Sequence, residues 1–107
     1  MFFKHEDGKI INLAEGVEIR VVGSGGSLML TEVTFRKNAA AATHSHPHEQ
    51  ISYIIKGSLE FTVADETKVV NAGDCVYIPG NAKHGALALE DSMLVDVFTP
   101  QRDDFKK

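Results

Sequence analysis

Short apolar runs alternate with turn residues along most of the chain. The turn stretches include Gly23–Gly26, Asn71–Asp74 and Pro79–Asn81, which are rich in residues that favour reversals of the backbone. No stretch shows the 3.6-residue apolar period of a convincing helix. Short strands at close spacing are typical of all-β sandwiches and barrels. We expect strands at residues 17–22, 28–35, 51–55, 59–63, 68–70, 75–78, 86–89 and 93–98.

The length of 107 residues is about that of one domain, and we expect residues 1–107 to form a single domain with one core. A core of this size is modest, so association with a second subunit is an option. The formal net charge of −4 argues against nucleic acid and anionic membranes as partners, because both favour a basic protein face.

The opening MFFKHED turns acidic before any apolar run of signal-peptide length, and no window approaches the length of a bilayer span. These features favour a cytoplasmic protein. The single cysteine, Cys75, has no partner for an internal disulfide. Its apolar neighbours favour a place in the core over a role as a nucleophile.

The stretch HSHPHEQ, residues 44–50, holds three of the five histidines. Alternate side chains of a strand face the same side, so His44 and His46 would face one bound metal ion. Gln50 would join them if the pleat continues. Glu49 has the opposite parity and would face away, which makes it a poor ligand candidate.

A further ligand must come from another strand, because two histidines on one strand cannot complete a coordination shell. His84 follows a Pro-Gly-Asn turn and is favoured over His5, which we expect to be structural or exposed. His48 shares the parity of the first two histidines and could replace Gln50 as a ligand. We favour a place at the rim for His48, because Pro47 interrupts the strand before it.

The candidate ligands lie in two spaced motifs, His44-x-His46-x₃-Gln50-x₆-Gly57 and Gly73-x₅-Pro79-x₄-His84. These resemble the two signature motifs of the cupins, with the short spacer of small bacterial members. The resemblance implies an all-β fold, a small double-stranded β-helix (cupin or jelly-roll barrel). It also implies that the three histidines and Gln50 hold one divalent metal ion per chain inside the barrel.

Three positions depart from the cupin motifs. Gln50 stands where Glu is usual, and Asn81 and Ala88 stand where the second motif usually has Gly and Asn. Three neutral imidazoles and a neutral amide leave the charge of the cation uncompensated, which favours a strong Lewis acid that attracts anionic oxygen ligands. Such a site lacks a carboxylate that could serve as base. Its donor set suits Zn, Ni, Fe, Mn or Co with little discrimination.

The stretch LVDVFTPQRDDF near the end of the chain offers that carboxylate. Asp96 shares a strand face with Leu94 and Phe98, and Pro100 should end the strand. If this face points inward, Asp96 lies in an apolar cavity that also holds the metal; an exposed Asp96 is the alternative. Arg102 is either a solvated tail residue or a clamp for a substrate carboxylate.

A closer resemblance runs over most of the chain. HSHPHEQ, the run GDCVYIP and the ending DVFTPQRDDF resemble the pectin-degradation cupins of the KdgF type. That family opens the ring of unsaturated uronates, released from pectin or alginate by lyases, to give linear keto acids. The resemblance implies a metal-dependent isomerase or lyase-like enzyme with a small anionic sugar-acid substrate. It implies Asp96, Phe98 and Arg102 as its catalytic segment, and a homodimer, as is common for small cupins.

Two other functions remain open. A metal-dependent dioxygenase would use the same three-histidine barrel with iron or manganese, although Gln50 in place of Glu is mildly against it. A non-catalytic metal- or sugar-binding module would use the same pocket without turnover.

Overall fold

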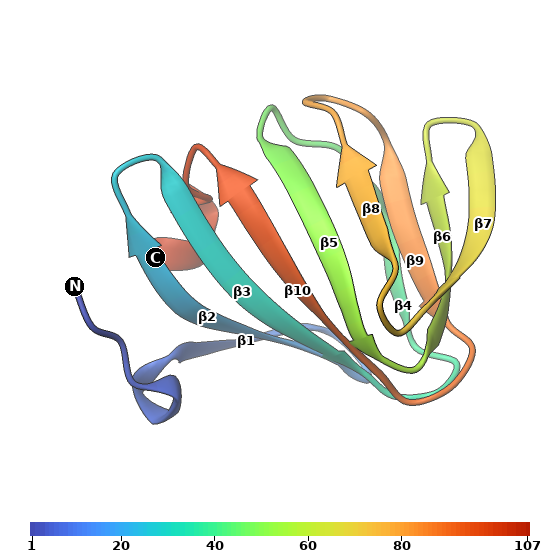
Figure 1. Ribbon diagram of the computed structural model, residues 1–107, viewed down its shortest axis with the longest axis horizontal. Helices are drawn as coiled ribbons and strands as arrows, with labels where there is room; N and C mark the ends of the chain where they lie inside the picture. Colours follow the sequence, from blue (N-terminus) through green and yellow to red (C-terminus); the bar gives the residue numbers. More distant parts are fainter.

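The computed structural model covers residues 1–107 and contains ten strands and two short 3₁₀ helices (Figure 1). No helix in it is long and apolar enough to cross a bilayer. The elements are η1 (His5–Asp7), β1 (Lys9–Ala14), β2 (Val17–Gly25), β3 (Leu28–Phe35), β4 (Ala40–His44), β5 (Glu49–Lys56), β6 (Ser58–Val63), β7 (Glu66–Asn71), β8 (Cys75–Ile78), β9 (His84–Ala88), β10 (Ser92–Thr99) and η2 (Asp103–Lys106).

The strands form two antiparallel sheets that face each other (Figure 1). The six-stranded sheet has the order β1-β2-β3-β10-β5-β8, and the four-stranded sheet has the order β4-β9-β6-β7. From β3 onward the chain crosses repeatedly between the sheets, as a double-stranded β-helix does. The predicted all-β barrel is therefore confirmed.

The core lies between the two sheets. In β5 the side chains alternate strictly between exposed and buried from Glu49 to Ile54, as expected where successive side chains point to opposite faces. The same alternation in β3 and β10 directs one face of each strand into the barrel. Fourteen buried apolar side chains form one cluster: Val17, Ile19, Met29, Val33, Phe35, Ile54, Leu59, Phe61, Ile78, Ala86, Ala88, Leu94, Phe98 and Phe105.

Gly57 marks the point where the chain leaves the six-stranded sheet for the four-stranded one. Its φ of +91° lies in the region that favours glycine. A Cβ atom there would lie 2.5 Å from the backbone oxygen of Asp91 and would also collide with Ser92. Both the conformation and the packing of this crossover therefore require glycine.

Two strands were not expected from the sequence. β1 lies outside the expected strands, because its side chains are exposed except for the half-buried Ile11 and it carries no amphipathic signal. β4 has the sequence AAATH, in which Thr43 is the only β-branched residue and alanine, which strands do not favour, predominates. β1 is a strand because it pairs with β2, and β4 is a strand because it pairs with β9.

Two other expectations are wrong. Gly23 to Gly25 belong to β2 and pair with β3, so the predicted loop shortens to a tight turn around Gly26. Cys75 is exposed and not part of the core. The alternation within β8 explains this, because Val76 and Ile78 take the inward positions and leave Cys75 on the outer face.

Candidate metal centre

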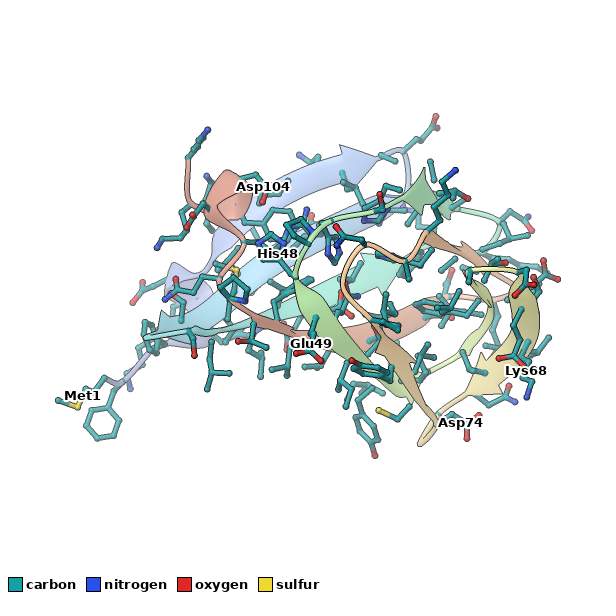
Figure 2. The ribbon with its side chains drawn as sticks, turned by 90° about the horizontal axis from the view of Figure 1, so that it is seen from above. Met1, His48, Glu49, Lys68, Asp74 and Asp104 are labelled. Atoms are coloured by element: carbon teal, nitrogen blue, oxygen red, sulfur yellow. The ribbon has the colours of Figure 1, made fainter.

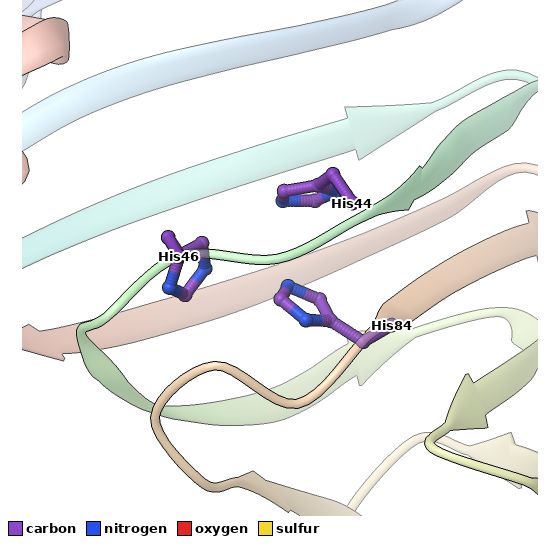
Figure 3. Close-up of side chains that lie close together, drawn as sticks. All are labelled: His44, His46 and His84. Atoms are coloured by element: carbon purple, nitrogen blue, oxygen red, sulfur yellow. The ribbon is translucent and has the colours of Figure 1, made fainter.

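Three imidazole rings converge (Figure 3), of which His46 and His84 are buried and His44 is exposed. His44 is the last residue of β4, His46 lies in the bend that follows, and His84 is the first residue of β9. One nitrogen atom from each ring lies within 4.8 Å of the other two. His44 and His84 are opposite each other in the β4–β9 pairing, so the register of these strands brings two of the three rings together.

Gln50 reaches the same place by a route that the sequence did not predict. β4 ends at His44 in the four-stranded sheet, and β5 begins at Glu49 in the six-stranded sheet. Residues 45–48 form a bend between the sheets, so the condition that the pleat continues from His44 to Gln50 is not met. Parity within β5 still directs Gln50 inward, with 6% exposure, and leaves Glu49 exposed on the outside.

The bend is tied to the loop that precedes β9. The backbone N–H of Asn81 donates to the carbonyl of His46 at 2.7 Å. A Cβ on Gly80 would lie 2.6 Å from the carbonyl oxygen of Pro47, so the two loops approach as closely as they do because residue 80 is glycine. Asn81 has a φ of +68°, a conformation that asparagine tolerates, so its departure from the cupin motif preserves the turn.

Each of the three rings is oriented by a hydrogen bond from Nδ1 to a main-chain carbonyl. A carbonyl oxygen only accepts, so Nδ1 carries the hydrogen and Nε2 of the neutral ring has a free lone pair. This is the tautomer that a metal-binding histidine with a carbonyl partner adopts. The N···O distances are 3.0 Å for His44 to Ala42, 3.2 Å for His46 to His48 and 2.9 Å for His84 to Ala82.

Two features of the Nε2 atoms are those expected of ligands to a cation. Nε2 of His84 is buried and has no hydrogen-bond partner. Nε2 of His46 lies 3.1 Å from Oε1 of Gln50. Burial, followed by the charges of Arg102, His84 and His44, lowers the pKa of His46 to about 4, so its ring is neutral near pH 7 and Nε2 has no hydrogen to donate. Two acceptor atoms this close suit adjacent ligands of one divalent metal ion.

Asp96 lies inside the barrel, 7% exposed, so the exposed alternative does not hold. It sits in β10 between Thr31 of β3 and Ser52 of β5, and the hydroxyl of Ser52 donates to its Oδ1 at 2.5 Å. Burial raises the pKa of Asp96 to about 6, while hydrogen bonds from Ser52 and Gln50 and the charge of Arg102 oppose the shift.

Asp96, His44 and His84 line one cavity of about 360 Å³. This volume falls in the range of small-molecule sites, which is roughly 300–1,000 Å³. Most of the lining is apolar and includes Phe98. The polar groups that line it are Thr43, His44, Gln50, His84, Asp96, Arg102 and Asp104.

Arg102 is not a solvated tail residue, since its side chain is only 11% exposed. Its guanidinium lies over the ring of Phe105 at 4.2 Å and faces Phe98 at 5.2 Å. Nε and Nη2 donate to the two carboxylate oxygens of Asp104 at 3.0 and 2.8 Å, and Arg102 lowers the pKa of Asp104. Asp104 uses two of the five N–H groups and leaves three for another anion.

The two other histidines stand outside the cluster. Nε2 of His48 lies 3.1 Å from the carbonyl oxygen of Gln101, which places this ring beside the site. His5 is exposed on the surface, with Nε2 2.6 Å from Glu32. Ser52 also faces the site and is not among the residues predicted from the sequence, although the parity of β5 places its side chain on the same face as Gln50.

Comparison with known proteins agrees with this geometry. Residues 31–98 match the cupin domain family. The pectin degradation protein KdgF of Dickeya dadantii is 35% identical over 95 residues, which cover 87% of this chain and 86% of that protein.

Two solved structures are similar over nearly their whole length, and each is 33% identical to this chain. An RmlC-like cupin from Shewanella frigidimarina has a TM-score of 0.90 and covers 97% of this chain and 94% of its own. KdgF from Halomonas sp. has a TM-score of 0.89 and covers 97% and 96%. The chain therefore belongs to the cupin family, in the branch that includes KdgF.

Proposed function

We propose that this protein opens the ring of unsaturated uronates from pectin or alginate breakdown, in a metal-dependent isomerisation to linear keto acids. One observation carries the proposal: a single cavity joins converging imidazole nitrogens to the buried carboxylate of Asp96 and the guanidinium of Arg102. The similarity to KdgF supports the same reaction class.

His44, His46, His84 and Gln50 would hold the metal ion, which supplies Lewis acidity toward the hydroxyl and carboxylate oxygens of a sugar acid. No carboxylate belongs to this donor set, so the protein must supply an acid or base from elsewhere in the cavity. Asp96 is the carboxylate that lies deepest in the barrel, and it faces the same space.

Arg102 and Phe98 would bind and shape the substrate. The three free N–H groups of Arg102 suit a sugar-acid carboxylate, and the ring of Phe105 fixes the guanidinium plane beneath them. Phe98 is 2% exposed and forms an apolar wall beside Asp96. The cavity thereby offers one charged end and one apolar side to a small, flat, anionic ring.

Asp96 would move the proton. Ring opening removes a proton from the anomeric hydroxyl, breaks the bond between the anomeric carbon and the ring oxygen, and leaves the electron pair on the ring oxygen as an enolate. The double-bond carbon that does not carry the ring oxygen then accepts a proton, and the enolate becomes a ketone. No atom or electron is gained overall, so a single positioned carboxyl group that accepts and returns a proton suffices.

The test follows the ultraviolet absorbance of the unsaturated uronate. We expect metal-loaded protein to accelerate loss of the chromophore above the spontaneous rate, with no uptake of oxygen. Oxygen consumption coupled to turnover would replace the proposal with a dioxygenase. Saturable binding of the uronate without turnover would replace it with a binding module.

We also propose a homodimer formed through the outer face of the six-stranded sheet. Leu30, Val97, Ile51 and Tyr77 lie in one row across β3, β10, β5 and β8, and they are 36 to 54% exposed. A continuous apolar patch of this kind is typical of a protein interface. Met1 projects away from the barrel and is available to a neighbour (Figure 2).

A cytoplasmic location stays a prediction.

A further inference from the structure

Ser52 connects the candidate ligand Gln50 to Asp96. Its side chain is 0% exposed. The hydroxyl oxygen accepts a hydrogen bond from Nε2 of Gln50 at 3.1 Å and donates to Oδ1 of Asp96 at 2.5 Å. We propose that Ser52 is a positioning residue that sets which end of the Gln50 amide faces the metal, an inference that rests on the metal-dependent function proposed above.

The direction of these hydrogen bonds follows from what each group can donate. A carboxylate only accepts, so the single hydroxyl hydrogen of Ser52 points to Asp96. The oxygen of Ser52 can then only accept from Gln50, and this requires the NH₂ end of the amide on the Ser52 side. The oxygen end is thereby turned toward the histidines, where Oε1 lies 3.1 Å from Nε2 of His46.

An amide needs this control, whereas a carboxylate does not. Only the oxygen of Gln50 can bind a cation, and a rotation of the amide by half a turn would present NH₂ instead. A glutamate at this position would present an oxygen in either orientation. The departure of residue 50 from the usual cupin Glu therefore creates a role for the hydroxyl two residues later.

The backbone makes the arrangement rigid. Gln50 and Ser52 share the inward face of β5, and Ser52 is opposite Asp96 in the β5–β10 register. Thr31, on the other flank of Asp96, is also 0% exposed, but its hydroxyl has no hydrogen-bond partner. Thr31 thus offers a matched control: a buried hydroxyl beside Asp96 that orients nothing.

The experiment measures the affinity for Co²⁺ alone by its visible absorption spectrum. We expect Ser52→Ala to weaken Co²⁺ binding by roughly 10- to 100-fold, the usual cost of losing a partner of a metal ligand, and to change the Co²⁺ spectrum. Ser52→Thr, which keeps the hydroxyl, should restore binding, and Thr31→Val should leave it unchanged. In a Gln50→Glu background, Ser52→Ala should change the affinity by less than about 3-fold, because either carboxylate oxygen can bind.

Two outcomes would overturn the inference alone: wild-type affinity in folded Ser52→Ala, or the same loss in the Gln50 and Gln50→Glu backgrounds. Wild-type protein that binds no divalent metal would overturn the metal site and this inference with it. Circular dichroism checks the fold of each variant. Ser52→Cys, which keeps the side-chain volume and weakens the hydrogen bonds, takes the place of Ser52→Ala if that variant does not fold.

Discussion

At the centre of β5 and β10, the two faces of the six-stranded sheet reverse the usual distribution of side chains. On the inner face, Ser52 and Asp96 are polar and are 0% and 7% exposed. On the outer face, their neighbours Ile51 and Val97 are apolar and 44% and 36% exposed. Polar side chains usually face water and apolar ones the core. One pair of strands, β5 and β10, thus carries the candidate site on its inner face and the proposed dimer surface on its outer face.

The inner face tolerates its polar groups because they bond to one another. Gln50, Ser52 and Asp96 form a continuous series of hydrogen bonds. An unpaired buried polar group costs about 1–3 kcal/mol, so each bond in this series offsets a penalty that strand burial would otherwise impose. On the outer face, the exposed apolar side chains have no partner within one chain, and burial against a second subunit would remove them from water.

The largest effect is expected from removal of an inner ligand. His84→Ala should abolish metal binding and reduce ring opening to the spontaneous rate, because His84 is one of the proposed ligands and its buried Nε2 has no other partner. Metal content after gel filtration and chromophore loss measure both effects. His5→Ala, which removes an exposed histidine outside the barrel, is the matched control and should behave like the wild type. Full activity in His84→Ala would refute the site.

Asp96→Asn should separate proton transfer from metal binding. We expect turnover to fall by roughly 10²-fold or more, as is common when a positioned acid or base is lost, with metal content intact. Steady-state kinetics and metal analysis of the same sample provide the measurement. Asp65→Asn, at an exposed turn, controls for the change of charge. Unchanged turnover in Asp96→Asn would remove this residue from the mechanism.

Arg102→Lys tests the charged end of the cavity. Lysine keeps the charge but cannot bind Asp104 and a substrate carboxylate at once through a planar fork, so we expect KM to rise about tenfold with a smaller change in kcat. Arg36→Lys, at an exposed position outside the cavity, should change neither constant. An equal loss in kcat alone would point to a role other than substrate binding.

The outer face should matter least for catalysis. Ile51→Lys places a charge in the centre of the apolar row, so we expect it to convert a dimer into a monomer while turnover per chain stays within about 2-fold. Sedimentation velocity at micromolar concentration measures the mass. Glu18→Lys, on an exposed position of β2, is the control. A monomeric wild type, or a dimeric Ile51→Lys, would contradict this use of the face.

The sequence was most informative where a strand carries its own pattern. The bounds of β3 and β8 match the prediction, and the alternation around Asp96 correctly placed its side chain with Leu94 and Phe98 on the buried face. These features depend on residues adjacent in the chain. Spacing within the two motifs likewise brought together His44, His46 and His84, whose nitrogen atoms converge, and the role of Gln50 as a ligand stays a prediction.

Features that depend on distant pairing could not be predicted. The alanines of β4 have little strand preference, and only pairing with β9 makes them a strand. Pro47 indicated an interruption at residues 45–48, but the change of sheet could not be predicted, because a continuous pleat and a crossover between two sheets place Gln50 on the same side. The pairing of Arg102 with Asp104 depends on η2, whose buried Phe105 is the only apolar anchor in a charged tail.

The most direct test of the central claim is a metal titration of chelator-stripped protein, with bound metal and loss of the uronate chromophore followed together. We predict that the rate rises in proportion to bound metal and reaches a plateau at one ion per chain, while Asp96→Asn binds the same amount of metal and stays near the spontaneous rate. A stripped protein that retains full activity, or a rate independent of bound metal, would contradict the account.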